Sequence, residues 1–259
     1  MKVSTLHRGT APLLISLPHD GTGLPLDVSA RMTETARKVP DTDWFVSRLY
    51  EFARKLDASI LVPSYSRYVV DLNRPPDDLS LYPGQNTTGL CPTVQFTGEP
   101  VYLPGQAPST DEVAERVDAF WRPYHQSLQA ELERLHAAHG RVLLWEGHSI
   151  KSRVPFLFDG RLPDINLGTA SGASCHAATQ ERVEKALAAQ SQYSWVSNGR
   201  FKGGYITRHY GRPGDGVEAI QLELAQCNYM DEEHGSYEPQ KAGQVQALLE
   251  TLLRQALAS

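Results

Sequence analysis

Short apolar runs alternate along the chain with longer segments in which apolar residues recur at helical spacing. Strong strand patterns lie at 13–17 (LLISL), 59–63 (SILVP), 141–145 (RVLLW) and 217–225 (VEAIQLELA). Weaker strand patterns lie at 67–72, 194–198 and 204–208. Helical spacing predicts helices over 43–57, 109–138, 176–190 and 237–257. The alternation predicts an α/β fold with a mostly parallel sheet that is covered on both faces.

Local signals mark the ends of two of these helices. Asp41, Thr42 and Asp43 are N-cap candidates for the helix at 43–57. Ser109 with Glu112 resembles a capping box at the start of the long helix, and Pro123 predicts a kink within it. Residues 75–108 are rich in Pro, Gly, Thr and Gln and predict a long loop. A loop of that length in a compact domain usually shapes a site.

Composition narrows the class of protein. The 259 residues suit one large α/β domain or two small ones, and 41% are hydrophobic, which supports a sizeable core. A net charge of −5 gives no electrostatic footprint for nucleic acid or an anionic membrane. The N-terminal apolar run is far shorter than the ~20 residues of a membrane span and lacks the longer core of a signal peptide. Three cysteines without close spacing argue against a disulfide framework and favour a reducing cytoplasm.

Polar side chains unsuited to a core follow three of the predicted strands. His19 comes after LLISLP, Asn73 and Arg74 come after YVVDL, and Glu146 and His148 come after RVLLW. In open α/β sheets, ligands bind outside the carboxyl ends of the strands. Three such strand ends predict one convergent polar site.

His19 and His148 are the best candidates for metal ligands. A catalytic zinc ion takes three protein ligands and keeps one position for water. Asp41 or Asp43 would be the third ligand, although either one is also explained as a helix N-cap. Each histidine alone is better explained as a hydrogen-bonded interior or surface residue, so the metal-site prediction depends on the placement of both after buried strands. The histidines at 125, 136 and 139 lack the HExxH pattern of helical zinc proteases.

Glu223 interrupts the strand pattern AIQLEL, where Gln221 and Glu223 alternate with apolar residues. Buried parallel strands usually read as continuous apolar runs, so Glu223 faces a polar cavity or lies on a half-exposed edge strand. In a cavity it would act as a general base beside a metal-bound water.

Arginines supply the third group of candidates. Arg67, Asn73 and Arg74 suit a substrate carboxylate, which arginine holds through a bidentate fork. A structural ion pair between Asp71 and Arg74 is the alternative. A second carboxylate has four candidate partners: Arg153, Arg200, Arg208 and Arg212. Neither GxSxG nor a phosphate-binding glycine loop is present in the sequence.

Six segments together resemble the N-formylglutamate amidohydrolases. They are PHDG (18–21), DTDW (41–44), SRYVVDLNR (66–74), EGHS (146–149), GGYITRHYG (203–211) and AIQLEL (219–224). The resemblance runs from about residue 12 to 235 and implies one domain over 1–259, with an α/β/α sandwich and a mixed sheet like that of zinc carboxypeptidases and aspartoacylases. It also implies hydrolysis of N-formyl-L-glutamate to formate and glutamate, a step of histidine degradation.

The resemblance assigns roles to individual residues. It implies that His19, Asp43 and His148 bind Zn²⁺, and that Glu223 is the general base. Arg67 would polarise the scissile carbonyl, Asn73 and Arg74 would hold the α-carboxylate, and Arg153 or Arg208 would hold the other carboxylate. The chain departs from the carboxypeptidase pattern HxxE, because position 22 is Thr. The open alternatives are a related amidohydrolase for another N-acyl amino acid and a non-catalytic anion- or metal-binding homologue.

Overall fold

One mixed sheet organises the molecule. In the computed structural model, which describes residues 2–80 and 87–258, seven strands pair in the order β1-β3-β2-β4-β7-β5-β6. They are β1 (Ser4–His7), β2 (Leu13–Ser16), β3 (Ser59–Pro63), β4 (Val142–Ile150), β5 (Ile165–Gly168), β6 (Trp195–Ser197) and β7 (Val217–Ala225). The β1–β3 and β5–β7 pairs are antiparallel and the other pairs are parallel. A short hairpin of β8 (Met230–Asp231) and β9 (Ser236–Tyr237) lies outside this sheet.

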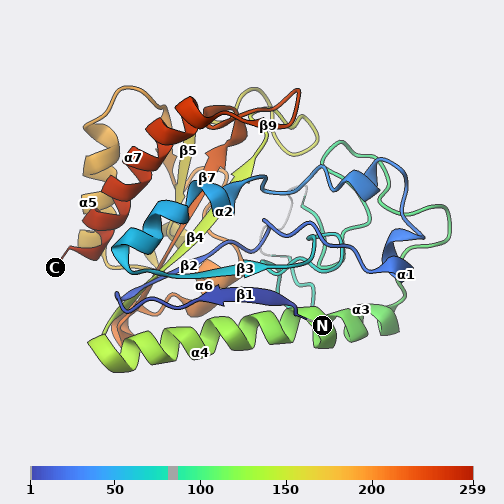
Figure 1. The fold of residues 1–259 in the computed structure, drawn as a ribbon, viewed down its shortest axis with the longest axis horizontal. Helices are drawn as coiled ribbons and strands as arrows, with labels where there is room; N and C mark the ends of the chain where they lie inside the picture. The colour runs from blue at the N-terminus through green and yellow to red at the C-terminus, as the bar shows by residue number, and fades with distance from the viewer. Residues whose placement is uncertain (1, 81–86, 259) are drawn as a thin grey trace.

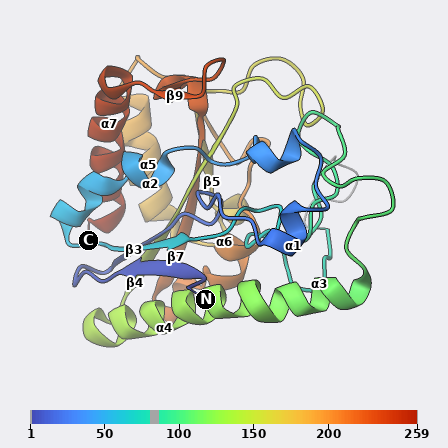
Figure 2. The same ribbon diagram turned by 45° about the vertical axis from the view of Figure 1, so that its right-hand side comes forward.

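Helices cover both faces of the sheet. One face carries α2 (Val46–Leu49), α5 (Ala177–Ala188) and α7 (Pro239–Leu257) (Figures 1 and 2). The other carries α3 (Thr110–Arg116), α4 (Arg122–His139) and α6 (Tyr205–Tyr210). The small helix α1 (Leu26–Ser29) lies among the loops at one end of the sheet. The predicted α/β/α sandwich with a mixed, mostly parallel sheet is confirmed.

Alternate residues of the central strands feed two separate cores. In β4, Leu143 and Trp145 pack with α2, α5 and α7, whereas Val142 and Leu144 pack with α4. Successive side chains of a strand point to opposite faces, so a strand covered on both sides is apolar at every position. This explains why RVLLW reads as a continuous apolar run.

Two segments with strand patterns have another structure. Residues 67–72 form a series of turns, in which Val69 and Val70 still reach the core beside α4. Residues 204–208 begin the helix α6 instead of a strand. Its first free amide groups are bound by buried side chains from distant segments: Ile206 N donates to Asn73 Oδ1 (2.9 Å), and Thr207 N donates to Glu146 Oε2 (3.1 Å). These long-range caps overcome the local β preference.

The predicted helix at 43–57 is broken into two short pieces. Phe45 takes a left-handed conformation (φ 63°), so α2 begins only at Val46, and a 3₁₀ helix follows over Glu51–Leu56. Neither Asp41 nor Asp43 caps it. The helix predicted from 109 is confirmed: Ser109 Oγ accepts from Glu112 N, and a π-helical turn over Val117–Trp121 joins α3 to α4. This turn precedes Pro123, which has no N–H for a regular helical bond.

Other differences affect the site directly. β4 extends to Ile150, so Glu146 and His148 lie within the strand and not after it. The strands β1 and β5 were not predicted. The described residues between β3 and α3 form turns and isolated bridges, as the loop prediction required, while 81–86 lie outside the described part.

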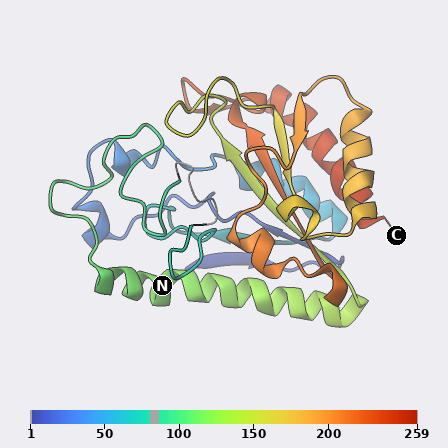
Figure 3. The ribbon, with the colours of Figure 1, turned by 180° about the vertical axis from the view of Figure 1, so that it is seen from behind.

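These loops gather with the segment around α1 at the end of the molecule away from the C-terminus (Figures 1 and 3). Among the described residues, no helix combines the length and the apolar character that a membrane crossing needs.

Candidate active site

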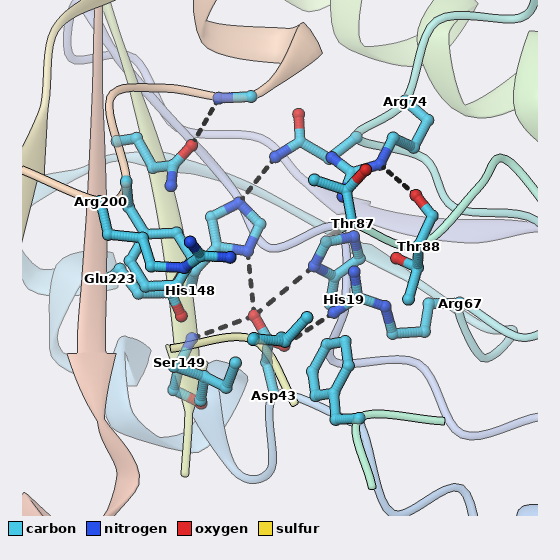
Figure 4. A pocket seen from close by; sticks show the side chains of 17 residues that line it. His19, Asp43, Arg67, Arg74, Thr87, Thr88, His148, Ser149, Arg200 and Glu223 are labelled. Carbon is cyan, nitrogen blue, oxygen red and sulfur yellow. Dashed lines mark hydrogen bonds and ion pairs between the residues drawn. The ribbon is translucent and has the colours of Figure 1, made fainter. Parts of the chain in front are cut away.

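Seven of the predicted site residues meet in one cavity at the loop-covered end of the central strands. His19 follows β2, His148 lies in β4 and Glu223 lies in β7. His148 and Glu223 continue the rows of side chains that face α4 further back along each strand. The side chains in these two rows are apolar where α4 packs against the sheet, and polar where loops cover the sheet instead of α4. The cavity measures about 90 Å³, and Asp43, Arg67, Asn73 and Arg74 also line it (Figure 4).

His19, Asp43 and His148 form a compact group of three buried ligand candidates, with one ligand atom from each within 4.8 Å of the others. Asp43 Oδ2 lies 2.9 Å from His148 Nδ1 and 3.7 Å from His19 Nδ1. The amide of Ser149 also donates to this oxygen (3.0 Å), which fixes the carboxylate between the two rings. The Nδ1 edges of both histidines therefore face one point.

Two further buried carboxylates hold the opposite edges of these rings. His19 Nε2 lies 2.7 Å from Asp71 Oδ1, and His148 Nε2 lies 2.7 Å from Glu146 Oε1. Each Nε2 can therefore donate to its carboxylate, which would leave the lone pair of each Nδ1 for a metal ion. A carboxylate behind a metal-binding histidine is the usual arrangement that orients the ring and raises its basicity.

Sequence reasoning gave neither carboxylate this role. The sequence suggests an ion pair between Asp71 and Arg74, but Asp71 pairs with Arg67 (2.7 Å) and His19. In the sequence, Glu146 stands out only as a polar residue at a strand end. Its spacing of two from His148 places both on the same face of a strand, and this was the signal that pointed to a contact.

Asp41, the other ligand candidate, lies outside the three-residue group. Its Oδ2 accepts hydrogen bonds from Tyr68 OH (2.6 Å) and Phe96 N (2.8 Å). It is therefore engaged in holding the loop that carries Phe96. The geometry favours Asp43 over Asp41 as the carboxylate between the histidines.

Burial and neighbouring charges shift the pKa values of the group in opposite directions. Burial lowers the pKa of His19, with Arg67 acting in the same sense. For His148, burial is outweighed by Glu146 and Asp43, which raise its pKa well above the usual value. Burial also opposes ionisation of Asp43, but His19 and His148 lower the pKa of this carboxyl below its usual value. Without a metal ion, the positive charge that this favours on His148 offsets the negative charge of Asp43.

Glu223 lies beside the three-residue group. It is 7% exposed and lines the same cavity. Burial raises the pKa of Glu223 to about 8, with a further contribution from the charge of Asp43. A buried carboxylate with a raised pKa in a polar cavity is a candidate for proton transfer.

Arginines give the cavity its positive charge. Arg67 is buried, and its Nη2 binds Asp71 while its guanidinium lies 4.9 Å from the ring centre of Phe96. Arg67 Nε is a buried donor without a hydrogen-bond acceptor among the described residues. Arg74 binds Thr88 O through Nε (2.9 Å), and Arg200 lies on the opposite side of the cavity from Arg74 in the view of Figure 4.

The other arginine candidates lie elsewhere. Arg153 is exposed and lines a second cavity, described below, but not this one. Arg208 is exposed and points its Nε at Gly203 O (2.8 Å). Arg212 lines a separate depression between α4 and α6. Of the four candidates for a second carboxylate, Arg200 is the one that lines the cavity of the metal-ligand candidates.

A close backbone approach completes the site next to Asn73. A Cβ atom at Gly204 would lie 2.3 Å from Asn73 Nδ2, so only glycine fits at this position. Gly204 N also donates to Gln221 Oε1 (2.7 Å). The start of α6 is thereby pressed against the side chain of Asn73, whose amide nitrogen lies 3.1 Å from His148 Nε2.

The donor set fits a divalent metal ion. Two imidazole nitrogens and one carboxylate are a common ligand set for catalytic zinc, and both rings carry the expected carboxylate behind them. With Glu223 for proton transfer and arginines for anionic groups, the arrangement suits hydrolysis of a small anionic amide.

Comparison with known proteins agrees with this chemistry. The family model described as N-formylglutamate amidohydrolase matches residues 11–230. An N-formylglutamate deformylase of Pseudomonas aeruginosa is 53% identical over 258 residues, which cover 99% of this chain and 97% of the relative. An N-formylglutamate deformylase of Pseudomonas putida is 51% identical, with coverage of 99% and 96%.

Solved structures give the same picture of the fold. The crystal structure of an N-formylglutamate amidohydrolase from Ralstonia eutropha JMP134 superposes with a TM-score of 0.84 at 25% identity, covering 99% of this chain and 97% of the other. A protein from Agrobacterium tumefaciens shares the fold with a TM-score of 0.71 at 18% identity, covering 98% and 96%.

Proposed function

The chain belongs to the N-formylglutamate amidohydrolase family, and from this membership and the site geometry we propose that it hydrolyses N-formyl-L-glutamate to formate and L-glutamate. The observation that carries the proposal is the placement of Glu223 beside the group of His19, Asp43 and His148 in one buried cavity. This combination supplies metal ligands and a proton-transfer group at the same point.

We propose that His19 Nδ1, His148 Nδ1 and one oxygen of Asp43 hold a single Zn²⁺ ion. A zinc ion in such a site lowers the pKa of water toward about 7 and polarises a carbonyl oxygen. Asp71 and Glu146 support this set by keeping the proton on the Nε2 atom of each histidine.

Glu223 moves the proton in the proposed reaction. Its carboxylate removes a proton from the attacking water, whose oxygen adds to the formyl carbon. Arg67 donates to the oxyanion that develops on the former carbonyl oxygen. Glu223 then delivers the proton to the amine nitrogen as the C–N bond breaks, which leaves formate and the free amino acid.

Substrate binding is assigned to the polar residues around the metal-ligand group. We propose that Asn73 and Arg74 hold the carboxylate nearest the scissile amide. Arg200, on the other side of the cavity in Figure 4, would hold the side-chain carboxylate in place of the predicted Arg153 or Arg208. A carboxylate bound in a half-buried cavity needs such a cation beside it.

The proposed reaction would be the last step of a histidine degradation route in the cytoplasm. The three cysteines, Cys91, Cys175 and Cys227, are all free, which agrees with a reducing compartment.

Formate release from N-formyl-L-glutamate, measured together with metal content, tests the function. The purified protein should release one formate per glutamate, lose this activity on dialysis against a chelator and regain it with Zn²⁺. N-formyl-L-leucine should be a poor substrate because it has no second carboxylate. Equal turnover of both compounds would replace the proposal with a general N-acyl amino acid hydrolase.

A further inference from the structure

A second and larger cavity lies directly behind one wall of the active-site cavity. It measures about 360 Å³. Pro40, Val154, Pro155 and Phe156 are among its apolar lining residues, and Asp41, Lys151 and Arg153 are among its charged ones. Phe96, Ser149 and Ile150 line both cavities, so these three residues form the wall between them. Neither the metal-ligand group nor Glu223 lines the second cavity.

The position of this wall relative to a bound substrate follows from the two edges of the His148 ring. The Nε2 edge faces the amide of Asn73 (3.1 Å), where the substrate carboxylate is proposed to bind. The Nδ1 edge faces Asp43 (2.9 Å), to which the backbone of Ser149 is hydrogen-bonded. The wall therefore lies across His148 from the carboxylate-binding end, as Figure 4 shows for Ser149 and Arg74.

This placement determines which half of the substrate meets the wall. If Asn73 and Arg74 hold the amino-acid half, the scissile amide reaches across the metal-ligand group, and the acyl half points away from them. The acyl carbon's remaining substituent, a hydrogen atom in a formyl group, then faces Phe96, Ser149 and Ile150.

Of the three wall residues, Phe96 is the one whose side chain can change without disturbing the ligands. Ser149 is tied to Asp43 through its amide and to Tyr229 through its hydroxyl (2.6 Å), and Ile150 ends the central strand β4. Phe96 lies on a loop and is half-buried. Its amide binds Asp41 and its ring packs over Arg67 at 4.9 Å, so the ring is held across the wall.

We propose that the second cavity is a latent acyl pocket, and that Phe96 closes it and thereby restricts the acyl group to formyl. The pocket would take an unbranched apolar acyl chain along the apolar part of its lining, which includes Ile150, Val154 and Phe156, while Asp41, Lys151 and Arg153 line its polar part. This inference rests on the proposed function, which sets the direction of the substrate in the site.

Hydrolysis of a series of N-acyl-L-glutamates with formyl, acetyl, butyryl and hexanoyl groups tests the inference. The wild type should lose kcat/KM steeply beyond formyl. In Phe96→Ala, the hexanoyl-to-formyl ratio of kcat/KM should rise at least ~10-fold, since a single methylene in an apolar pocket is worth about 10–200-fold. The ratio is the readout because loss of the ring over Arg67 can lower all rates together.

Three further variants separate an acyl pocket from a general loosening. Phe96→Leu should shift the ratio in the same direction by less. Thr97 lines only the second cavity. In the double variant Phe96→Ala/Thr97→Trp, the indole should refill the second cavity and return the hexanoyl-to-formyl ratio to the wild-type value. Phe52→Ala, a half-buried phenylalanine on the α7 side of the sheet, should leave the ratio unchanged.

The outcomes distinguish the inference from the function beneath it. If the wild type releases formate but Phe96→Ala and Phe96→Leu keep the wild-type acyl preference, the acyl pocket is overturned and the proposed function stands. A wild type that accepts hexanoyl as well as formyl overturns the closing role of Phe96. A wild type that releases no formate with Zn²⁺ present overturns the proposed function itself.

Discussion

Glu223 lies directly opposite His148 in the parallel ladder between β4 and β7. The two residues face the same side of the sheet, so the carboxylate stands one strand away from a metal-ligand candidate. β7 lies between β4 and β5, which excludes the alternative that Glu223 occupies a half-exposed edge strand. Glu223 is therefore a buried residue of an interior strand, and its side chain faces the cavity.

The first prediction concerns this pair. Glu223→Gln keeps the shape of the side chain but cannot take a proton, so kcat should fall by the ~10²–10⁴ typical of a lost acid–base group. Zn²⁺ content and substrate affinity should stay close to wild type. Glu218→Gln, on the same strand but bound to His176 N and outside the cavity, is the matched control. Near-normal turnover in Glu223→Gln would remove Glu223 from the role of base.

The second prediction separates the two aspartates of the DTDW segment. Asp43→Asn should lose most of the bound Zn²⁺, as should His19→Ala and His148→Ala. Asp41→Asn should keep its metal, because Asp41 binds Tyr68 and the amide of Phe96 and stands outside the ligand group. Elemental analysis after dialysis decides between them. Equal metal loss in both aspartate variants would contradict the assignment of the ligand to Asp43.

Much of the site was predictable because apolar runs mark the buried strands, and residues with ligand or proton-transfer chemistry interrupt or follow these runs. Buried strands are visible as apolar runs, and the polar residues that interrupt or follow them have no place in a core. His19, His148 and Glu223 were found in this way, and all three line the cavity. The strand prediction was too short at β4, yet His148 was still identified because its polar character stood out.

The parts that sequence reasoning missed depend on contacts between distant segments. α6 is a helix because Asn73 and Glu146, from far along the chain, bind its first amide groups. The turns at 67–72 are shaped by Asp71, which binds both Arg67 and His19. No local pattern records such partners, so β-branched and aromatic residues in both segments suggested strands. The choice of Arg200 over Arg153 and Arg208 likewise needed the shape of the cavity.

The third prediction concerns the second substrate carboxylate. N-formyl-L-glutamine should be hydrolysed with kcat/KM at least ~10-fold below that of N-formyl-L-glutamate, because a hydrogen bond to a charged group contributes about 1.5–3 kcal/mol. Arg200→Ala should become nearly indifferent to this substrate change. Arg153→Ala and Arg208→Ala, whose side chains do not line the cavity, should keep the full discrimination. Discrimination lost in Arg208→Ala but kept in Arg200→Ala would reverse the assignment.

The last prediction concerns the pH dependence of folding and a histidine outside the site. His125 on α4 is 4% exposed; its Nε2 donates to Leu72 O (2.9 Å), and its Nδ1 accepts from Tyr210 OH (3.0 Å). Burial lowers the pKa of His125 to about 3, with a smaller contribution from His209. In the unfolded chain the pKa is about 6.5. Between about pH 6.5 and 3 the unfolded state therefore binds a proton that the folded state does not.

The free energy of unfolding should consequently fall as the pH drops below about 6.5, with His125 contributing a slope that approaches ~1.4 kcal/mol per pH unit. His125→Gln removes the imidazole that binds this proton in the unfolded state. It should be less stable than wild type at pH 7.5, and the difference should narrow as the pH falls toward 5. Tyr210→Phe removes the hydroxyl that bonds Nδ1 but keeps the buried ring, so it should retain the wild-type slope. Urea unfolding of the three proteins from pH 5 to 8 measures these slopes. If the difference in the free energy of unfolding between wild type and His125→Gln stays constant from pH 5 to 8, His125 takes up its proton equally in the folded and unfolded states.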